Sequence, residues 1–287
     1  MTLPPQLAEL TQGLDVRSAS RVHGGDIAVA YRLDTPDGPL FAKTHPSPTN
    51  DLFAREAAGL RALRRHVPGT LRVPQVLRES RNGLVLEWIE EGGRRTGATE
   101  AELGSGLAAL HRTTNDTFGG LAGDASGYLG SVPVDLTPST DWPDFYVQRR
   151  VAPLVERAIA EGSLDPAARG LLDRLAPRAA QLCGPETTPA LVHGDLWGGN
   201  RFVDRDGTNW LIDPACHWAV REVDLAMMQL FGGFGPECYT AYDQAFALAD
   251  GWRERVPWYQ LTPLLVHAIL FGGGYGDAAL RAMQRYA

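Results

Sequence analysis

The sequence predicts a mixed α+β protein of two lobes, with a small β-rich N-terminal lobe and a larger, mainly helical C-terminal lobe. At 287 residues the chain exceeds the usual size of a single hydrophobic core. Strand patterns fill the first third, and helical patterns dominate after Glu91-Gly92-Gly93. We therefore expect lobes of residues 1–89 and 90–287, with a nucleotide-sized cleft between them.

A hairpin is expected near the start of the N-terminal lobe. Residues 26–33 (DIAVAYRL) contain β-branched and aromatic side chains, and residues 40–43 resume the same pattern. Asp37-Gly38 lies between them and is a turn signal, so the two segments are expected to pair. Two further strands are predicted at residues 73–77 and 84–88.

One helix is expected within the N-terminal lobe, from Leu52 to about His66, with Asn50 or Asp51 as its N-cap. Residues 119–139 are rich in Gly, Pro, Asp and Ser, which predicts a loop. The other elements all fall in the C-terminal lobe: helices at residues 99–113, 142–159, 166–182 and from 223 to the end, and short strands at 191–192 and near Phe202 and Leu211.

The composition narrows the class of protein. Hydrophobic residues make up 44% and charged residues 21%, as in an ordinary globular enzyme. The net charge is -7 and no basic patch stands out, which disfavours nucleic-acid binding. The three widely spaced cysteines form no disulfide framework and indicate a reducing cytoplasm. No secretory signal or apolar run of the ~18 residues needed for a membrane span is present, so no membrane partner is expected, and the oligomeric state is not indicated.

The segment His193 to Asn200 (HGDLWGGN) carries the predicted chemistry. Kinase catalytic loops place a His two positions before the catalytic Asp and an Asn five positions after it, as His193, Asp195 and Asn200 are placed here. Downstream, a short apolar strand ends in the carboxylate of Asp213. Carboxylate and amide oxygens are the ligands that Mg²⁺ prefers, so Asn200 and Asp213 are the candidate metal ligands and Asp195 the candidate base.

Each part of this pattern has a plainer explanation. Gly-Asp is ordinary turn chemistry, and Asp213-Pro214 could simply terminate a strand. A His, Asp and Asn at these spacings, followed by a strand and a second Asp, is much less expected by chance. The combination favours phosphoryl transfer from ATP with Mg²⁺.

The N-terminal lobe supplies candidate phosphate-binding residues. Lys43 ends a predicted strand and Glu56 lies within the following helix, the order of the lysine and glutamate that position ATP phosphates in kinases. Either residue alone would normally be an exposed surface charge. Gly24-Gly25 precedes the first strand and could let the backbone approach the phosphates, although a Gly pair is more often a plain turn. The chain contains no P-loop, serine-hydrolase or HExxH motif.

At this level of detail the chain resembles the fructosamine kinases, also called ketosamine-3-kinases, whose fold is protein-kinase-like and related to the aminoglycoside phosphotransferases. The resemblance spans residues 24–275, and HGDLW with REVDLAM is far more specific than HGD, which aminoglycoside and choline kinases share. The matching segments are LVHGDLWGGN (191–200), IDPA (212–215), REVDLAM (221–227), LFGGF (230–234), FGGGY (271–275), GGDI (24–27) and GPLFAK (38–43).

The resemblance implies an ATP-dependent kinase that phosphorylates the 3-hydroxyl of ketosamines, the sugar adducts of amines and of protein lysines, in metabolite or protein deglycation. It implies Trp197 facing the sugar, with a buried structural Trp197 as the alternative. It also implies roles for residues around the nucleotide: Asp195 as base, Lys43 and Glu56 at the phosphates, Asn200 and Asp213 on magnesium, and Glu87, Trp88 and Ile89 beside the adenine.

Some positions depart from the family pattern. Ala28 replaces an Asn, residues 216–220 (CHWAV) replace a segment with tyrosines, a glycine and a histidine, and Val266 and Ile269 replace asparagines. These changes bear on the substrate more than on phosphotransfer. The charged cluster of Arg221, Glu222 and Asp224 is expected to hold the catalytic loop, with substrate contact as the alternative.

Two other functions remain open at the level of sequence. One is a related small-molecule kinase that acts on an aminoglycoside, an aminoalcohol or a free sugar, which would need an acidic pocket in the C-terminal lobe for a cationic acceptor. The other is a non-catalytic nucleotide-binding protein. That alternative is disfavoured because a mere binder has no need of the base Asp195.

Overall fold

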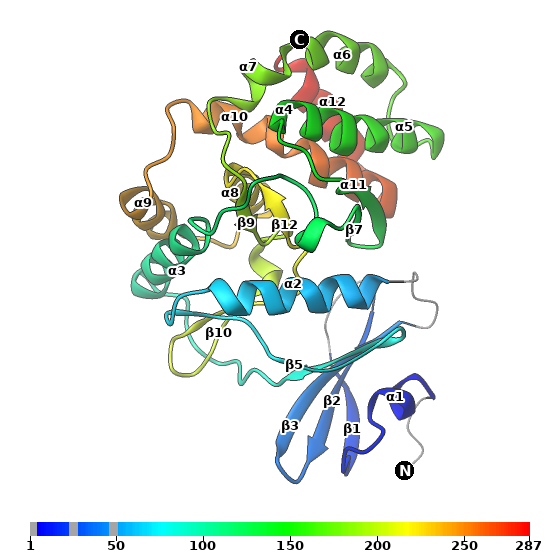
Figure 1. The fold of residues 1–287 in the computed structure, drawn as a ribbon, viewed down its shortest axis with the longest axis vertical. Helices are drawn as coiled ribbons and strands as arrows, with labels where there is room; N and C mark the ends of the chain where they lie inside the picture. The colour runs from blue at the N-terminus through cyan, green and yellow to red at the C-terminus, as the bar shows by residue number, and fades with distance from the viewer. Residues whose placement is uncertain (1–4, 23–27, 46–50) are drawn as a thin grey trace.

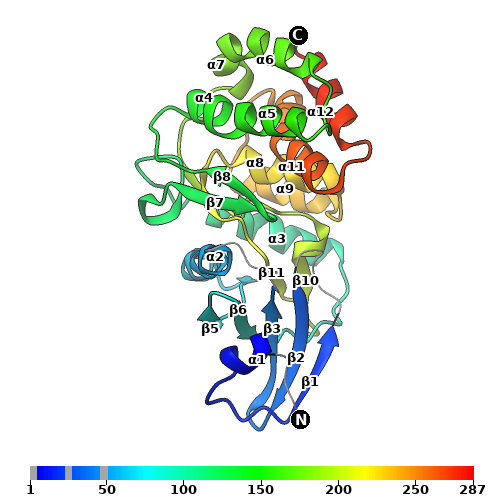
Figure 2. The same ribbon diagram turned by 90° about the vertical axis from the view of Figure 1, so that its right-hand side faces the viewer.

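The computed structural model describes residues 5–22, 28–45 and 51–287. An antiparallel sheet forms one end of the molecule and helices form the other, and the long helix α2 lies between them (Figures 1 and 2). The mixed α+β class and the two-part arrangement predicted from the sequence are confirmed. Within the described ranges, no helix combines the length and the apolar character needed to cross a membrane.

The sheet has five strands in the order β1-β2-β3-β6-β5. The predicted hairpin is confirmed as β2 and β3, and its turn contains Gly38 at a φ of 117°, a value that favours glycine. Residues 26 and 27 of the predicted first strand lie outside the described residues. The strand bounds are β1 Ser18–Val22, β2 Val29–Thr35, β3 Gly38–Thr44, β5 Val76–Ser80 and β6 Gly83–Glu87.

Two sets of apolar side chains cover the faces of this sheet. On one face a small core contains Leu33, Ala42 and Val85, and the short helix α1 (Pro5–Leu10) contributes Leu7 and Leu10. On the other face, α2 (Leu52–His66) buries its apolar stripe of Phe53, Ala57, Leu60 and Leu63 in the main core. The predicted helix is therefore confirmed.

The cap of α2 differs from the expectation. Asp51 occupies the N-cap position, but its carboxylate makes no capping hydrogen bond. It accepts instead from Arg55 and Tyr128, and the other candidate cap, Asn50, lies outside the described residues.

The C-terminal part corrects the sequence prediction at residues 119–139. This segment contains an antiparallel hairpin, β7 (Ser126–Leu129) and β8 (Val132–Asp135), where a loop was expected. The residues do alternate between buried and exposed, but Gly127 and Pro133 obscure the pattern. A Cβ at Gly127 would lie 2.4 Å from Cδ1 of Leu136, so a larger residue here would require this buried leucine side chain to move.

The predicted helices of this part are present, although several are subdivided. The segment 142–159 contains a π-helical stretch, Phe145–Val151, and the segment 166–182 is interrupted by a 3-10 turn. The helix bounds are α3 Gly97–Leu110, α4 Trp142–Asp144, α5 Ala152–Ala160, α6 Ala167–Leu175, α7 Ala179–Cys183, α8 Glu222–Phe231, α9 Pro236–Ala245, α10 Trp252–Tyr259, α11 Leu261–Phe271 and α12 Tyr275–Gln284.

Short strands frame the predicted catalytic loop. β9 pairs with β12, β10 pairs with β11, and β11 also pairs in parallel with β4, which comes from the first third of the chain. The strand predicted at residues 73–77 begins later than expected, as β5 at Val76, because residues 73–75 around Pro74 form no strand. β4 lies before the predicted range and was not expected. The remaining bounds are β4 Leu71–Arg72, β9 Ala190–Val192, β10 Arg201–Val203, β11 Asn209–Leu211 and β12 His217–Ala219.

Candidate active site

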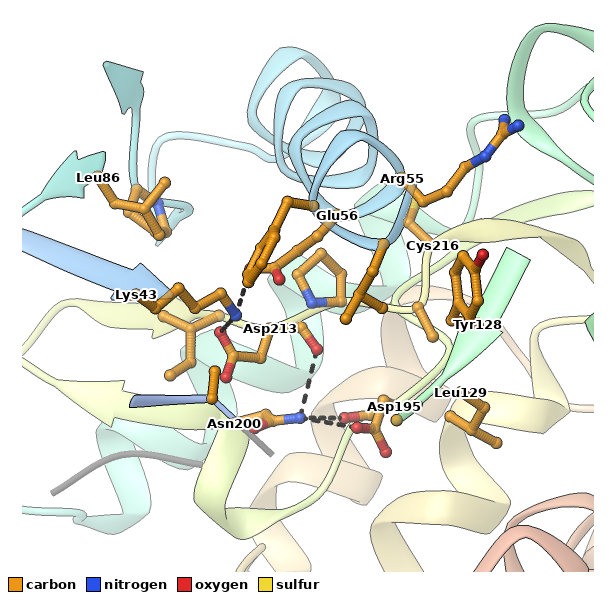
Figure 3. Close-up of a pocket in the computed structure, with 18 of the residues that line it drawn as sticks. Lys43, Arg55, Glu56, Leu86, Tyr128, Leu129, Asp195, Asn200, Asp213 and Cys216 are labelled. Carbon is orange, nitrogen blue, oxygen red and sulfur yellow. Dashed lines mark hydrogen bonds and ion pairs between the residues drawn. The ribbon is translucent and has the colours of Figure 1, made fainter. Parts of the chain in front are cut away.

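A cavity of about 650 Å³ contains residues from both parts of the chain. Lys43 reaches it from β3 and Glu56 from α2, while Asp195, Asn200 and Asp213 reach it from the loops around β9, β10 and β11 (Figure 3). These five side chains are separated by up to 170 positions in the sequence, and the fold brings them to one place. The volume is in the usual range for small-molecule sites.

Lys43 is held between two carboxylates. Its Nζ lies 2.6 Å from Glu56 Oε1 and 2.9 Å from Asp213 Oδ1, and the residue is buried. Burial lowers the pKa of Lys43, but the charges of Asp213 and Glu56 outweigh burial and raise the pKa above its ordinary value. Burial also raises the pKa of Glu56, to about 7, against the opposing charge of Lys43. The lysine is therefore a fixed cation inside the cavity.

The catalytic loop is shaped by its first two residues. Gly194 has a φ of 81°, and a Cβ there would lie 2.2 Å from the carbonyl oxygen of Ala215, so only glycine fits. The buried His193 donates through Nε2 to the carbonyl of Ile212 at 2.9 Å and accepts at Nδ1 from the amide of Asp195 at 3.3 Å. Burial lowers the pKa of His193, which keeps this bridge neutral. His193 thus orients Asp195.

Asp224 of α8 holds the backbone of the same loop in place. Its carboxylate is fully buried and accepts from the backbone amides of His193 at 2.7 Å and Gly194 at 2.8 Å, and from Nε2 of His111 at 3.1 Å. Burial raises the pKa of the Asp224 carboxyl, but the hydrogen bonds from His111 and the loop outweigh burial and keep the pKa below its ordinary value. Asp224 therefore acts on the loop as an ionised acceptor.

The other two members of the charged cluster point elsewhere. Arg221 pairs with Glu186 at 3.1 Å, and its guanidinium lies 3.7 Å from the ring centre of Phe246. Glu222 forms a buried ion pair with Arg255 at 2.6 Å. Neither side chain lines the cavity, and of the three residues it is Asp224 that makes the expected contact with the catalytic loop.

Asn200 and Asp213 present oxygens beside Asp195. The amide nitrogen of Asn200 donates to the carbonyl of Asp195 at 2.8 Å and to its carboxylate at 3.2 Å, so Oδ1 is the Asn200 atom that can bind a cation. Asp213 adopts a φ of 52°, a left-handed conformation that is rare outside glycine and concentrated at functional sites. Burial and then the charge of Asp213 raise the pKa of Asp195 to about 7.

The oxygens of Asn200 and Asp213 suit a magnesium ion whose remaining ligands are phosphate oxygens and water. Among the described residues, no three His, Cys, Asp or Glu side chains form a metal-binding cluster. Mg²⁺ seldom needs such a cage, because it commonly binds one or two protein oxygens together with substrate phosphates and water. One carboxylate, Asp213, and one amide oxygen, Asn200, correspond to that donor set.

The predicted nucleotide-binding residues divide into two groups. The first group lines the cavity and consists of Glu87, Trp88 and Ile89. The Glu87 carboxylate accepts from the Gln75 amide at 3.0 Å and from the Arg64 guanidinium at 3.3 Å. The Glu87 carboxylate is therefore already engaged and is not the group that a nucleotide would meet at this position. Gly24 and Gly25 lie outside the described residues.

Trp197 lies at the edge of the cavity and is 39% exposed, so the alternative of a buried structural tryptophan is wrong. Its ring covers Gly199, where a Cβ would lie only 2.2 Å from the indole. Phe231 of α8 meets the ring edge-on at 6.3 Å. Three of the positions that depart from the family pattern, Ala28, Cys216 and Val266, also line the cavity.

Sequence reasoning missed a polar network at one wall of the cavity. Arg55 of α2 pairs with Asp51 at 2.8 Å and with Asp124, and the Tyr128 hydroxyl donates to Asp51 at 2.6 Å. Figure 3 shows Arg55 and Tyr128 on the same side of the pocket, with the Arg55 guanidinium extending away from Glu56. The network joins the helix that carries Glu56 to the hairpin that was expected to be a loop, and no motif marked it.

Arg95 is a second residue without a motif. Its guanidinium donates to the carbonyls of Gly198 at 2.8 Å, Arg201 at 3.0 Å and Gly233 at 3.0 Å. It thereby fixes the end of the catalytic loop opposite to Asp224. Two adjacent arginines, Arg94 and Arg95, in a polar linker gave no signal in the sequence.

Comparison with known proteins shows the family to which the chain belongs. The model of the fructosamine kinase family matches residues 5–287. A probable ketoamine kinase of Enterococcus faecium is 35% identical over 270 residues, which cover 92% of this chain and 94% of that protein. The chloroplastic protein-ribulosamine 3-kinase of Arabidopsis thaliana is 31% identical over 287 residues, which cover 96% of this chain and 85% of that protein.

Solved structures agree as well. A Thermobifida fusca protein, provisionally named a fructosamine-3-kinase, has a TM-score of 0.88 and 36% identity over 99% of this chain and 98% of its own. An aminoglycoside phosphotransferase with 16% identity has a TM-score of 0.59 over 98% of this chain and 96% of its own, which shows a shared protein-kinase-like fold.

Proposed function

Because this chain belongs to the fructosamine kinase family, we propose that it transfers the γ-phosphate of ATP to the 3-hydroxyl of ketosamines. The observation that carries the proposal is the position of the Asp195 carboxylate in the same cavity as the Lys43–Glu56–Asp213 charge network. A base for the hydroxyl and a fixed cation for phosphate are the parts that phosphoryl transfer requires.

The residues divide the work between binding and proton transfer. Residues 1–89 form the nucleotide-binding lobe, with the adenine against the backbone of residues 87–89 and Lys43 neutralising phosphate charge. Asp195 orients the acceptor hydroxyl and takes its proton, since its carboxylate lines the cavity and His193 holds its backbone. Asn200 and Asp213 hold magnesium, which supplies neutralisation of the phosphate oxygens when bound. Most of the acceleration comes from positioning and charge.

The substrate is a free ketosamine or the glycated lysine of a protein. Phosphate on the third carbon makes the adduct unstable and releases the amine, so the reaction serves deglycation. The relatives named above are ketoamine and ribulosamine kinases, which favours this acceptor class over aminoglycosides or aminoalcohols. The three free thiols fit a reducing cytoplasm as the site of action.

The test is a panel of acceptors. The purified enzyme is given ATP and magnesium with fructose-lysine, ribulose-lysine, kanamycin or choline, and phosphate is located on the product by NMR. We expect phosphate at the 3-hydroxyl of one or both ketosamines. Asp195→Ala is the control, with turnover at least ~10²-fold lower and nucleotide binding retained. Phosphate on kanamycin with none on either ketosamine would overturn the proposal.

A further inference from the structure

Exposed aromatic side chains gather at the opening of the cavity. Among the residues that the structure describes, the large hydrophobic side chains with substantial exposure are Trp197 at 39% and Phe271 at 50%. Both line the cavity that contains Asp195. Single exposed apolar residues are ordinary on a protein surface, but two aromatic rings in one cavity mark a binding surface.

These two rings belong to a continuous aromatic wall. Phe231 contacts Trp197 at 6.3 Å and His267 at 4.6 Å between ring centres, and His267 contacts Phe271 at 5.4 Å. Tyr275 lies behind His267 at 5.1 Å. The aromatic wall, defined as these five residues, therefore runs from the catalytic loop to the end of α11 and the start of α12.

The backbone fixes the outer end of the wall. α11 ends at Phe271, and Gly272 follows with a φ of 63°, which turns the chain toward α12. His267 donates through Nδ1 to the carbonyl of Pro263 at 2.8 Å, one turn earlier in the same helix. Four of the five wall residues thus lie on helices, and Trp197 lies in the loop after Asp195.

The chemistry of a ketosamine matches this surface. Only three carbon atoms separate the 3-hydroxyl oxygen from the amine nitrogen, so the amine and its substituent must leave the site close to Asp195. Trp197 follows Asp195 by two residues and is the nearest part of the wall in sequence. A protonated amine is attracted to aromatic faces, and the methylene groups of a lysine side chain pack against them.

Carboxylates at the cavity are less suited to this role. Asp124 is paired with Arg55, and Asp213 is paired with Lys43. Glu87 accepts from Arg64 and from a backbone amide. Glu90 and Glu91 also line the cavity, in the segment that follows residues 87–89, and Glu90 pairs with Arg205 at 3.7 Å. The aromatic wall instead begins two residues after Asp195, where the amine must leave.

We propose that the aromatic wall binds the amine-bearing arm of the ketosamine, with Phe271 as its outer contact. The enzyme then selects ketosamines whose cationic nitrogen carries a flexible aliphatic chain, as in a glycated lysine side chain. This inference rests on the proposed function and names the part of the substrate that the site recognises beyond the sugar.

The experiment compares two acceptors and two substitutions. The acceptors are fructose-lysine and its ether analogue, in which oxygen replaces the amine nitrogen, so that charge differs and length does not. Phe271→Leu removes the ring and keeps apolar volume, and Phe271→Tyr keeps the ring as the matched control. Because Phe271 is half exposed, both variants are expected to fold, and equal Tm values would verify this.

The expected result is selective. In Phe271→Leu, KM for fructose-lysine rises by about 3- to 30-fold relative to the ether analogue, the range for one cation–π contact. The kcat and the KM for ATP stay unchanged, and Phe271→Tyr retains the wild-type KM ratio. An unchanged KM ratio in Phe271→Leu would overturn the arm-binding role alone. Failure of the wild-type enzyme to phosphorylate any ketosamine would overturn the proposed function, and this inference with it.

Discussion

Replacing Asp224 by asparagine tests whether one buried carboxylate holds the catalytic loop. The substitution keeps the size of the side chain and one acceptor oxygen, but it exchanges the other oxygen for an NH₂ group. The carboxylate accepts from the amide of His193 through Oδ2 and from the amide of Gly194 through Oδ1. An asparagine can accept from only one of them, and its NH₂ group faces the other N–H.

The loss of stability can be estimated from these contacts. One charge-assisted hydrogen bond contributes about 1.5–3 kcal/mol, and a buried N–H left without an acceptor costs about 1–3 kcal/mol. Since Asp224 is fully buried, water cannot replace the missing partner. We expect Asp224→Asn to lower the free energy of unfolding by about 3–5 kcal/mol, which lowers Tm by roughly 10 °C in a chain of this size.

The pH dependence follows from the direction of the pKa shift. The folded state holds the Asp224 pKa below its ordinary value, so the stabilisation is complete above the ordinary aspartate pKa of about 3.9. It is lost as the pH falls through the folded-state pKa. The difference in Tm between wild type and Asp224→Asn is therefore expected to be constant from about pH 8 to about pH 5 and to shrink at lower pH.

Activity gives a second readout, and Glu222→Gln gives the control. Glu222 lies in the first turn of the same helix and forms a buried pair with Arg255, away from the cavity. Both variants are expected to lose stability, but only Asp224→Asn displaces Asp195 and lowers kcat, by about 10²-fold, well below either Tm. Equal kcat values in the two variants, or an unchanged Tm in Asp224→Asn, would refute the anchoring role.

Three further changes probe the cavity. Asp213→Asn is expected to weaken magnesium-dependent nucleotide binding, and an unchanged magnesium titration of nucleotide affinity would argue against this ligand. Lys43→Met is expected to lower kcat/KM for ATP by about 10- to 100-fold through the loss of a charged hydrogen-bond donor to phosphate, measured by steady-state kinetics. A double-mutant cycle of Arg55→Ala with Asp124→Ala is expected to give a coupling energy of about 0.5–1 kcal/mol, because both side chains are partly exposed. If the changes in unfolding free energy of the two single variants simply add in the double variant, the two residues do not interact energetically.

The elements that could be predicted are those whose turn residues or apolar spacing lie within the element itself. The β2–β3 hairpin followed from its Asp37-Gly38 turn, and α2 followed from its apolar spacing. The β7–β8 hairpin was missed because Gly127 and Pro133 are poor strand formers in isolation. They are accommodated by tertiary contact, since Gly127 packs beneath Leu136 and the Val132 side chain is buried in the core. β4 was missed because its pairing partner, β11, is remote in the sequence.

The site divides in the same way. The residues at fixed spacing around Asp195 could be found in the sequence, and the structure brings Lys43, Glu56 and Asp213 to them. The contacts that hold these residues could not be found, since each depends on which elements pack together. Asp224 meets the catalytic loop only because the fold places the first turn of α8 against the residues that follow β9. The REVDLAM segment carries three charged residues, and the sequence does not reveal which of them faces the loop.

The residues that depart from the family pattern differ in whether they line the cavity. His217 to Ala219 form β12, which pairs with the strand that leads into the catalytic loop and does not line the cavity. Cys216 does line it, and a Cβ added at Gly59 of α2 would lie 2.9 Å from the Cys216 Cβ. A larger residue at 216 would press on the helix that carries Glu56, so its size is coupled to the Lys43 contact. Of the departures, Ala28, Cys216 and Val266 line the cavity, so these are the positions whose side chains can bear directly on the substrate.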